Sequence, residues 1–288
     1  MRLSYKSSMD ANDDNIHGDL WTQLRLAVSF LTRLPIARDR NGSDTYGNLR
    51  DDADMVPDLA STMGIFPLVG FGIGGVGALV LGLLSWIGVP VAVAVTLAIG
   101  LVIWFTGALH EDGLSDIADG FGGGDDQNRK LEIMRDSRLG AYGTVSLAVV
   151  IVTKIAALAT IATNDIGTAA GVLIAATVWS RALIAPTMRW LEPARDDGLG
   201  ANAGKPSEGE TLKGLALAIL LALLVLIAPA GWGVITVLIA GALGAIVVGL
   251  IALRQIGGYT GDVLGACVIV SETSALVAAS AVISGSVL

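Results

Sequence analysis

The sequence predicts an all-α fold: a polytopic integral membrane helix bundle with six to seven transmembrane helices. Hydrophobic residues make up 53% of the 288 residues and the mean hydropathy is +0.69, whereas charged residues make up only 15%. An average soluble domain carries roughly 25% charged residues, and so few polar groups cannot cover a soluble surface. The charges that remain are concentrated in a few segments, separated by runs long enough to cross a bilayer.

The apolar runs set the number of predicted crossings. A helix rises about 1.5 Å per residue, so a bilayer core of ~30 Å needs about 20 residues. Residues 59–109 and 214–253 contain no Asp, Glu, Lys or Arg, and each is long enough for two crossings. Turns are expected at 88–90, where Pro90 cannot continue a helix, and at 228–231. Three further runs, interrupted by charged residues, are 141–162, 167–190 and 263–283.

Residues 1–58 are predicted to form a cytoplasmic extension before a single transmembrane catalytic domain at 59–288. The extension is acidic, and its first 19 residues lack the apolar core of a signal peptide. Within it, the stretch 21–36 places Leu24, Val28 and Leu31 near one helical face. A short, charged stretch of this kind indicates an interfacial amphipathic helix rather than a span.

The distribution of charge predicts the orientation and narrows the partners. Sixteen of the 18 basic residues fall in segments that alternate crossings place on one side. Because basic loops stay on the cytoplasmic side, the N-terminus and the segment after residue 110 are expected there, with the chain in the cell inner membrane. The formal net charge of −8 argues against a nucleic-acid partner. The single cysteine, Cys267, excludes an internal disulfide.

Three aspartates at helical spacing follow His110. Asp112, Asp116 and Asp119 are separated by four and then three residues, so on a helix they share one face. Carboxylates held this close repel one another unless a cation compensates. Hard oxygen ligands without clustered His or Cys favour Mg²⁺ or Mn²⁺. The alternative is a solvated acidic helix face at a membrane exit.

Basic residues follow the acidic motif within the predicted cytoplasmic catalytic loop, about 110–140. A flexible triple glycine at 122–124 separates the two groups. The guanidinium fork of arginine matches phosphate oxygens, so acids and arginines together indicate a diphosphate held through Mg²⁺. The general excess of Lys and Arg in cytoplasmic segments explains some of these basic residues equally well. The candidates for substrate or phosphate contacts here are Arg129, Lys130, Arg135, Asp136 and Arg138.

Four charged residues fall within or beside the predicted spans. Lys154, Arg181 and Glu272 are costly there unless paired or facing water. Arg181 and Glu272 are therefore either functional or a structural ion pair. Asp262 lies at the cytoplasmic mouth of the last span, where it provides a fourth carboxylate for the site. His110 is either a base or a surface histidine with local hydrogen bonds.

Motifs in order along the chain resemble cobalamin synthase, the adenosylcobinamide-GDP ribazoletransferase family. They combine short N-terminal signatures with the acidic motif, the basic segment after it and a glycine-rich segment before the last span. The matching stretches are LTRLPI (31–36), FPLVG (66–70), HEDGLSDIADG (110–120), IMRDSR (133–138), GGYTGD (257–262) and LGA (264–266). The acidic extension before Trp21 departs from the family pattern.

The resemblance implies the last assembly step of the cobalamin nucleotide loop, catalysed by a membrane-bound, Mg²⁺-dependent enzyme. Adenosylcobinamide-GDP is joined to α-ribazole or its 5′-phosphate, and GMP is released. On this basis Asp112, Asp116 and Asp119 would bind the metal, and Asp119 or else His110 would accept the hydroxyl proton. Phosphate charge and the departing GMP would be stabilised by Arg135 and Arg138. Further substrate contacts are expected from Arg129, Lys130, Asp136, Arg181 and Asp262.

Other classes of protein remain open at this stage. A CDP-alcohol-type phospholipid phosphotransferase also uses an aspartate-rich membrane helix, but Ser115 and Asp116 stand where its motif places Ala-Arg. A transporter would favour acids within the spans, and the apolar runs show no inverted repeat. A scaffold without chemistry would tolerate loss of Asp116. Apart from the substrates, the expected partner is the lipid bilayer. Homo-oligomerisation is left open.

Overall fold

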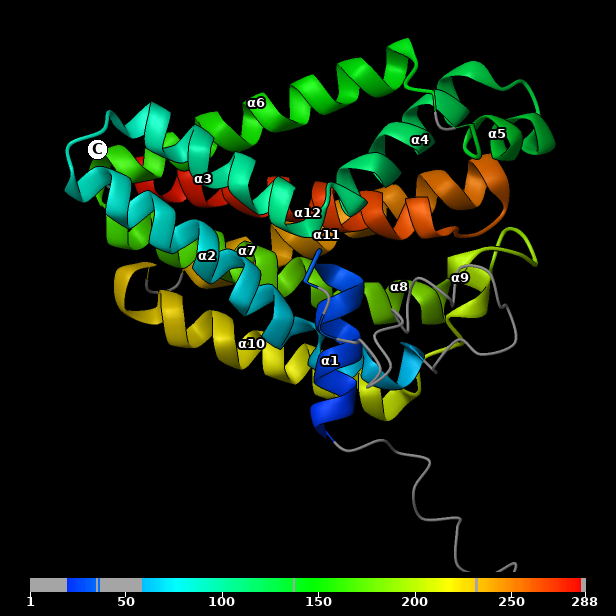
Figure 1. Cartoon of the computed structure of the whole chain (residues 1–288), viewed down its shortest axis with the longest axis horizontal. Coiled ribbons are helices and arrows are strands. Elements are labelled where there is room, and N and C mark those ends of the chain that lie inside the picture. The colour runs from blue at the N-terminus through cyan, green and yellow to red at the C-terminus, as the bar shows by residue number, and fades with distance from the viewer. Residues whose placement is uncertain (1–19, 35, 37–58, 137, 231–232, 286–288) are drawn as a thin grey trace, which may run out of the picture.

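The structure is a computed structural model that describes residues 20–34, 36, 59–136, 138–230 and 233–285. Most of the predicted N-terminal extension lies outside these residues. Within them the chain is helical, and the elements are arranged as one bundle (Figure 1). The elements are α1 Leu20–Leu31, η4 Leu59–Ile65, α2 Phe66–Trp86, α3 Val91–Thr106, α4 Leu109–Gly123, α5 Gln127–Ile133, α6 Ala141–Asn164, α7 Ile166–Ala182, α8 Ile184–Trp190, α9 Leu199–Asn202, α10 Glu208–Ala230, α11 Gly233–Ile256 and α12 Gly261–Gly285.

Six described helical segments are long and apolar enough to cross a membrane. They are Leu59–Trp86, Ala141–Asn164, Ile166–Trp190, Glu208–Ile227, Gly233–Ile256 and Gly261–Ile283. A seventh arises if α3 and α4, bent by 87° at their junction, count as one broken span. The prediction of a polytopic helical bundle with six to seven spans is confirmed.

The bend between α3 and α4 comes from two residues in the left-handed region of backbone conformation. Gly107 has φ 71° and Ala108 has φ 57°. Glycine adopts this conformation freely, whereas alanine does so only under constraint. The segment after α1 supplies part of that constraint, because the Arg33 N–H donates a hydrogen bond to the Phe105 carbonyl (2.9 Å). The apolar run of α3 therefore stops here, and the acidic motif continues in a new direction.

Helix α1 is amphipathic, as predicted. It buries Ala27 and Leu31, whereas Trp21 is 60% exposed. The helix packs on η4 and α2 and crosses the long helices of the bundle (Figure 1). It thus forms one wall of the region in which α3 turns into α4.

Small residues allow close packing in the bundle. A Cβ at Gly70 on α2 would lie 2.6 Å from the Thr177 carbonyl oxygen of α7, and one at Gly74 would lie 2.7 Å from the Ile174 Cα. Close approach of this kind is typical of helix contacts in membranes, where there is little hydrophobic force between helices.

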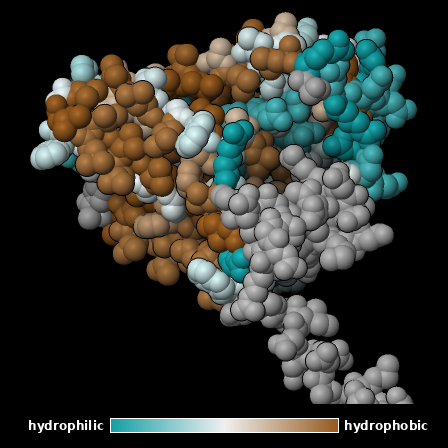
Figure 2. All heavy atoms as spheres, viewed as in Figure 1, coloured by the Kyte–Doolittle hydropathy of each residue, from teal (hydrophilic) through white to brown (hydrophobic). Residues whose placement is uncertain are grey.

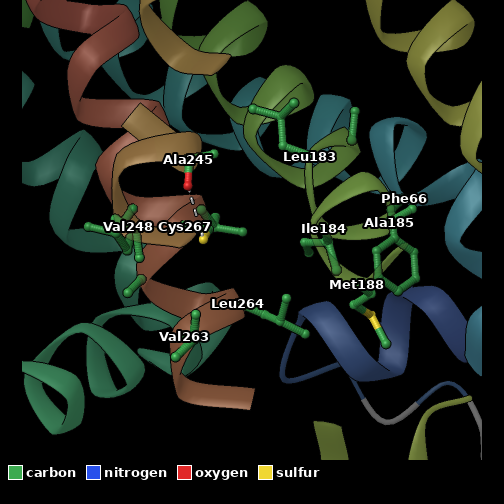
Figure 3. Close-up of a cluster of buried hydrophobic side chains, with 14 of the residues drawn as sticks. Phe66, Leu183, Ile184, Ala185, Met188, Ala245, Val248, Val263, Leu264 and Cys267 are labelled. Carbon is green, nitrogen blue, oxygen red and sulfur yellow. Dashed lines mark hydrogen bonds between the residues drawn. The ribbon is translucent and has the colours of Figure 1, made fainter. Parts of the chain in front are cut away.

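A buried apolar cluster joins α8, α11 and α12. Cys267, the one cysteine of the chain, is buried in it and its thiol donates to the Ala245 carbonyl (3.6 Å; Figure 3). Leu264 projects from α12 toward Ile184 and Met188 on α8 (Figure 3). This cluster provides the apolar base beneath the polar end of the bundle.

The polar residues gather at one end of the bundle, over α4 and α5, while the long helices present an apolar surface (Figure 2). The segment predicted to carry the chemistry, about 110–140, contains the two helices α4 and α5. The acidic motif lies on α4, as its helical spacing indicated. The catalytic role of this segment stays a prediction.

Candidate active site

Helix α4 separates its charged residues onto two sides. Asp112 is exposed and Asp116 is half-buried, and the charges of Asp112, Asp119 and Asp262 all act on Asp116. His110 and Glu111 are buried instead, at 3% and 7% exposure. The alternative of a surface histidine at position 110 is therefore wrong. On a helical projection His110 lies half a turn from Asp112, so the two side chains leave the helix in different directions.

Glycines bring α4 into close contact with α12. A Cβ at Gly265 would lie 3.3 Å from the His110 Cα, and Gly113 lies directly against the backbone of Asp262. Larger residues at these two positions would push the helices apart. The close contact brings the Asp262 carboxylate near Asp112, although the two residues lie far apart in the sequence.

A cavity of about 340 Å³ opens beside this contact. Its polar lining comes from His110, Asp112, Arg195 and Asp262. The apolar lining comes from α1, η4, α4, α8, the segment before α10 and α12, and includes Phe30, Leu59, Met63, Leu109, Ile184, Met188, Ala203 and Leu264. A largely apolar cavity with a few convergent polar groups is typical of a small-molecule site.

Arg195 is a cavity residue that the sequence reasoning missed. It lies on the segment between α8 and α9, which pairs with the segment before α12 through two backbone hydrogen bonds. The Ala194 N–H donates to the Tyr259 carbonyl (2.8 Å), and the Tyr259 N–H donates to the Glu192 carbonyl (2.9 Å). Burial and the Glu192 charge raise the pKa of Tyr259. Nothing local in the sequence marks Arg195, because the residues that position it come from a distant segment.

The glycine-rich stretch before α12 makes this pairing possible. A Cβ at Gly258 would lie 3.1 Å from the Ala194 nitrogen, and a Cβ at Gly200 would lie 2.8 Å from the Gly261 nitrogen. The backbones of the two segments therefore touch where side chains would separate them. The GGYTGD motif thus positions both Asp262 and Arg195.

Asp119 makes a different contact from the other two aspartates. Its carboxylate accepts hydrogen bonds from the N–H groups of Gly140 (2.8 Å) and Gly143 (2.9 Å) at the start of α6. Negative charge at a helix N-terminus is stabilising. Asp119 therefore ties α4 to α6, and it does not line the cavity. Its metal-binding and proton-accepting roles stay predictions.

The predicted basic residues are mostly engaged at the surface. Arg129 pairs with Glu132 (2.7 Å), and both are exposed. The Lys130 ammonium donates to the Gln255 side chain at the end of α11 (2.6 Å).

Arg138 and Arg135 complete the basic group. Arg138 pairs with Asp136 (2.5 Å), and its hydrogen bonds lower the pKa of Asp136. Arg135 donates to both oxygens of Asp197 (2.6 and 2.8 Å), close to Arg195 in the sequence. Of this group, only Arg135 contacts the segment that borders the cavity, and the substrate roles of all of them stay predictions.

Arg181 belongs to a buried ion cluster inside the bundle. Glu272 of α12 accepts from Lys154 of α6 (2.6 Å) and from Arg181 of α7. All three side chains are at most 3% exposed. Their charges act on the nearby His110 and Glu111. The structure thus shows the ion pair that was one of the two alternatives, and it does not place Arg181 on the cavity.

The described residues contain no ready-made metal cage. Among them, no group of three or more His, Cys, Asp or Glu side chains is arranged to hold a metal ion. Mg²⁺ usually takes one or two protein carboxylates and completes its shell with water and substrate phosphates. Asp112, Asp116 and Asp262 provide hard oxygen donors that suit this pattern.

The fold and site define a class: a polytopic helical membrane protein with an acidic, small-molecule cavity at one polar end of the bundle. Residues 23–280 match the family described as cobalamin-5-phosphate synthase. The chain belongs to this family, which confirms the family that its motifs predicted. No solved structure matches the chain.

Curated relatives agree with this assignment. A protein of Bradyrhizobium diazoefficiens is 39% identical over 90% of this chain and 93% of its own length. One of Mesorhizobium japonicum is 41% identical with the same coverage, and one of Xanthobacter autotrophicus is 40% identical over 88% of this chain and 92% of its own length. All three are named adenosylcobinamide-GDP ribazoletransferase.

Proposed function

We propose that this protein is a Mg²⁺-dependent transferase that joins adenosylcobinamide-GDP to α-ribazole or α-ribazole 5′-phosphate and releases GMP. This is the last assembly step of the cobalamin nucleotide loop. The observation that carries the proposal is the convergence of Asp112, Asp262, His110 and Arg195 on one cavity, in a chain that belongs to the cobalamin-5-phosphate synthase family.

The reaction is a phosphoryl transfer with one bond formed and one broken. The ribose 3′-hydroxyl of the acceptor attacks the phosphorus that carries the aminopropanol arm of the corrinoid. The anhydride bond to GMP breaks, GMP leaves, and the hydroxyl proton passes to a base. Catalysis of such transfers consists mainly of positioning and of stabilising charge.

The carboxylates of Asp112, Asp116 and Asp262 would hold Mg²⁺, which supplies positive charge to neutralise the phosphates. Asp112 and Asp262 border the cavity, and Asp116 lies within the field of both. Arg135 is tied to the segment that carries Arg195, so it is the best placed of the predicted arginines to act near the phosphates.

Of the two predicted proton acceptors, the geometry favours His110. It lines the cavity, whereas Asp119 is not among the lining residues. Both carboxylate oxygens of Asp119 already accept backbone hydrogen bonds. A base needs a free lone pair within reach of the hydroxyl it deprotonates.

The membrane location follows from the same reasoning. We place the protein in the cell inner membrane, with its polar end and N-terminus on the cytoplasmic side, because the basic segments gather there. Donor, acceptor and Mg²⁺ would then all reach the cavity from the cytoplasm.

A substrate test distinguishes this function from its alternatives. Purified protein in detergent micelles receives adenosylcobinamide-GDP with α-ribazole or its 5′-phosphate, with Mg²⁺ or with EDTA. We expect GMP release only when donor, acceptor and Mg²⁺ are all present. CMP release from a CDP-alcohol would instead identify a phospholipid-type phosphotransferase. No nucleotide release with either donor would contradict the proposed function.

A further inference from the structure

The guanidinium of Arg195 has a hydrogen-bond donor for which no described residue provides an acceptor. Its Nη1 is buried and has no hydrogen-bond partner within the part of the chain that the structure describes. Its two acidic neighbours are both at 3.8 Å, Asp262 from Nη2 and Asp197 from Nε. These distances exceed a hydrogen bond. A buried guanidinium nitrogen without an acceptor is costly. The Arg195 side chain lines the cavity and is 19% exposed, so a ligand with acceptor oxygens can reach the guanidinium from there.

Two neighbouring arginines already have acceptors for their guanidinium groups. Arg135 donates to both oxygens of Asp197, and Arg189 donates to the Pro206 carbonyl (3.0 Å). The backbone pairing with Tyr259 also holds the Arg195 segment in place beside α12. A fixed guanidinium with an open donor is suited to phosphate, which its planar fork binds through two oxygens.

The walls of the cavity indicate what carries that phosphate. Phe30, Met63, Met188 and Leu264 surround the space with aromatic, thioether and aliphatic groups. Such surfaces pack well against a flat aromatic ring. The volume of about 340 Å³ lies at the lower end of the range for small-molecule pockets, roughly 300–1,000 Å³. It suits a ribonucleoside with a bicyclic base, whereas a corrin ring with its amide side chains is far larger.

We infer that this cavity is the acceptor subsite and that Arg195 binds the 5′-phosphate of a phosphorylated ribonucleoside. The inference rests on the proposed function and specifies which of its two substrates the cavity holds. The aromatic base packs against Phe30 and Met188, and the ribose lies between Arg195 and the carboxylates of Asp112 and Asp262. This arrangement brings the ribose hydroxyls to His110. Arg195 thereby determines the preference for a phosphorylated acceptor.

The test compares two acceptors in one purified protein. GMP release is measured with saturating adenosylcobinamide-GDP and varied α-ribazole or α-ribazole 5′-phosphate, for the unaltered protein, Arg195→Gln and Arg195→Lys. Arg254→Gln is the matched control, because Arg254 is an exposed arginine at the end of α11. We expect Arg195→Gln to lower kcat/KM for the phosphorylated acceptor about 10- to 100-fold. The value for α-ribazole should fall by a clearly smaller factor, since no phosphate contact is lost with this acceptor.

The remaining outcomes separate the inference from the proposed function. An equal loss with both acceptors, or a raised KM for the donor, would overturn the inference, because Arg195 would then serve the fold or the donor. Unchanged kinetics with both acceptors would also overturn it. If the unaltered protein releases no GMP with either acceptor, the proposed function itself fails. Arg195→Lys keeps the charge, so it should retain a preference for the phosphorylated acceptor even if Arg195→Gln folds poorly.

Discussion

Gly113 on α4 lies directly against the backbone of Asp262 on α12. A Cβ at Gly113 would be 2.7 Å from the Asp262 carbonyl oxygen and 2.9 Å from its Cα. Real Cβ atoms do not approach backbone this closely, so only glycine permits the contact. It joins the acidic motif to the glycine-rich motif before the last helix, and the cavity opens at that junction.

Replacing Gly113 with alanine should therefore separate α4 from α12. We expect Gly113→Ala to destabilise the protein by about 1–3 kcal/mol, as overpacking does in other cores, and to lower GMP release. Thermal unfolding in detergent and the rate of GMP release measure the two effects. Gly123→Ala is the control on the same helix, because its Cβ would meet only the Ile133 Cδ1 at 3.5 Å. Equal behaviour of the two variants would contradict the close contact.

The carboxylates of Asp112 and Asp116 should matter for catalysis and not for folding. Asp112→Asn and Asp116→Asn are each expected to lower kcat about 100-fold or more, by analogy with loss of one charge-stabilising group elsewhere. Thermal stability without Mg²⁺ should be unchanged or higher, because repulsion between the carboxylates is relieved. Asp125→Asn, an exposed acid just after α4, is the control. Full activity of Asp116→Asn would show that Asp116 does not bind the metal.

Asp119 should behave differently from these two acids. Its carboxylate accepts the N–H groups of Gly140 and Gly143, so Asp119→Ala would leave two donors without their charged acceptor. We expect a loss of about 1–3 kcal/mol in stability, whether or not Mg²⁺ is present. Thermal unfolding of Asp119→Ala and Asp112→Asn, each with and without Mg²⁺, makes the comparison. Unchanged stability in Asp119→Ala would show that the contact with α6 is not structural.

The buried ion cluster should be sensitive to loss of its acid. Glu272→Gln leaves Lys154 and Arg181 buried without a countercharge, and removal of one partner from a buried pair costs about 3–5 kcal/mol. Glu132→Gln is the control, since its partner Arg129 is exposed and a surface pair contributes about 0–1 kcal/mol. Unfolding midpoints in detergent give both values. Similar midpoints would mean that Glu272 does not stabilise the bundle.

The sequence predicted most of the membrane helices because their signal is simple. A run of about 20 apolar residues has few alternatives to a span. The bend at Gly107 and Ala108 carries no such signal, since alanine normally avoids positive φ and only the packed structure imposes it here. The helical spacing of the acids agrees with α4, although the glycines of this segment weaken an isolated helix.

The candidate site was predicted in part. The acids of α4 and the position of Asp262 could be read from spacing and from the expected mouth of the last span. A helical projection sets His110 half a turn from Asp112, whereas the structure shows both residues lining the cavity. Arg195 could not be identified, since its environment is made by Tyr259 and Asp262 from a distant segment. Likewise, the contact of Asp119 with the start of α6 depends on how the helices pack.

Chemical labelling of the cavity tests most directly that it is the site of transfer. The chain has one cysteine, Cys267, which is buried, so Ala203→Cys introduces a thiol that lines the cavity. Labelling is done with a small methanethiosulfonate reagent and followed by mass, and GMP release is then measured. We predict that labelling blocks GMP release and that α-ribazole 5′-phosphate slows the labelling. Full labelling with undiminished GMP release would contradict the assignment of the cavity.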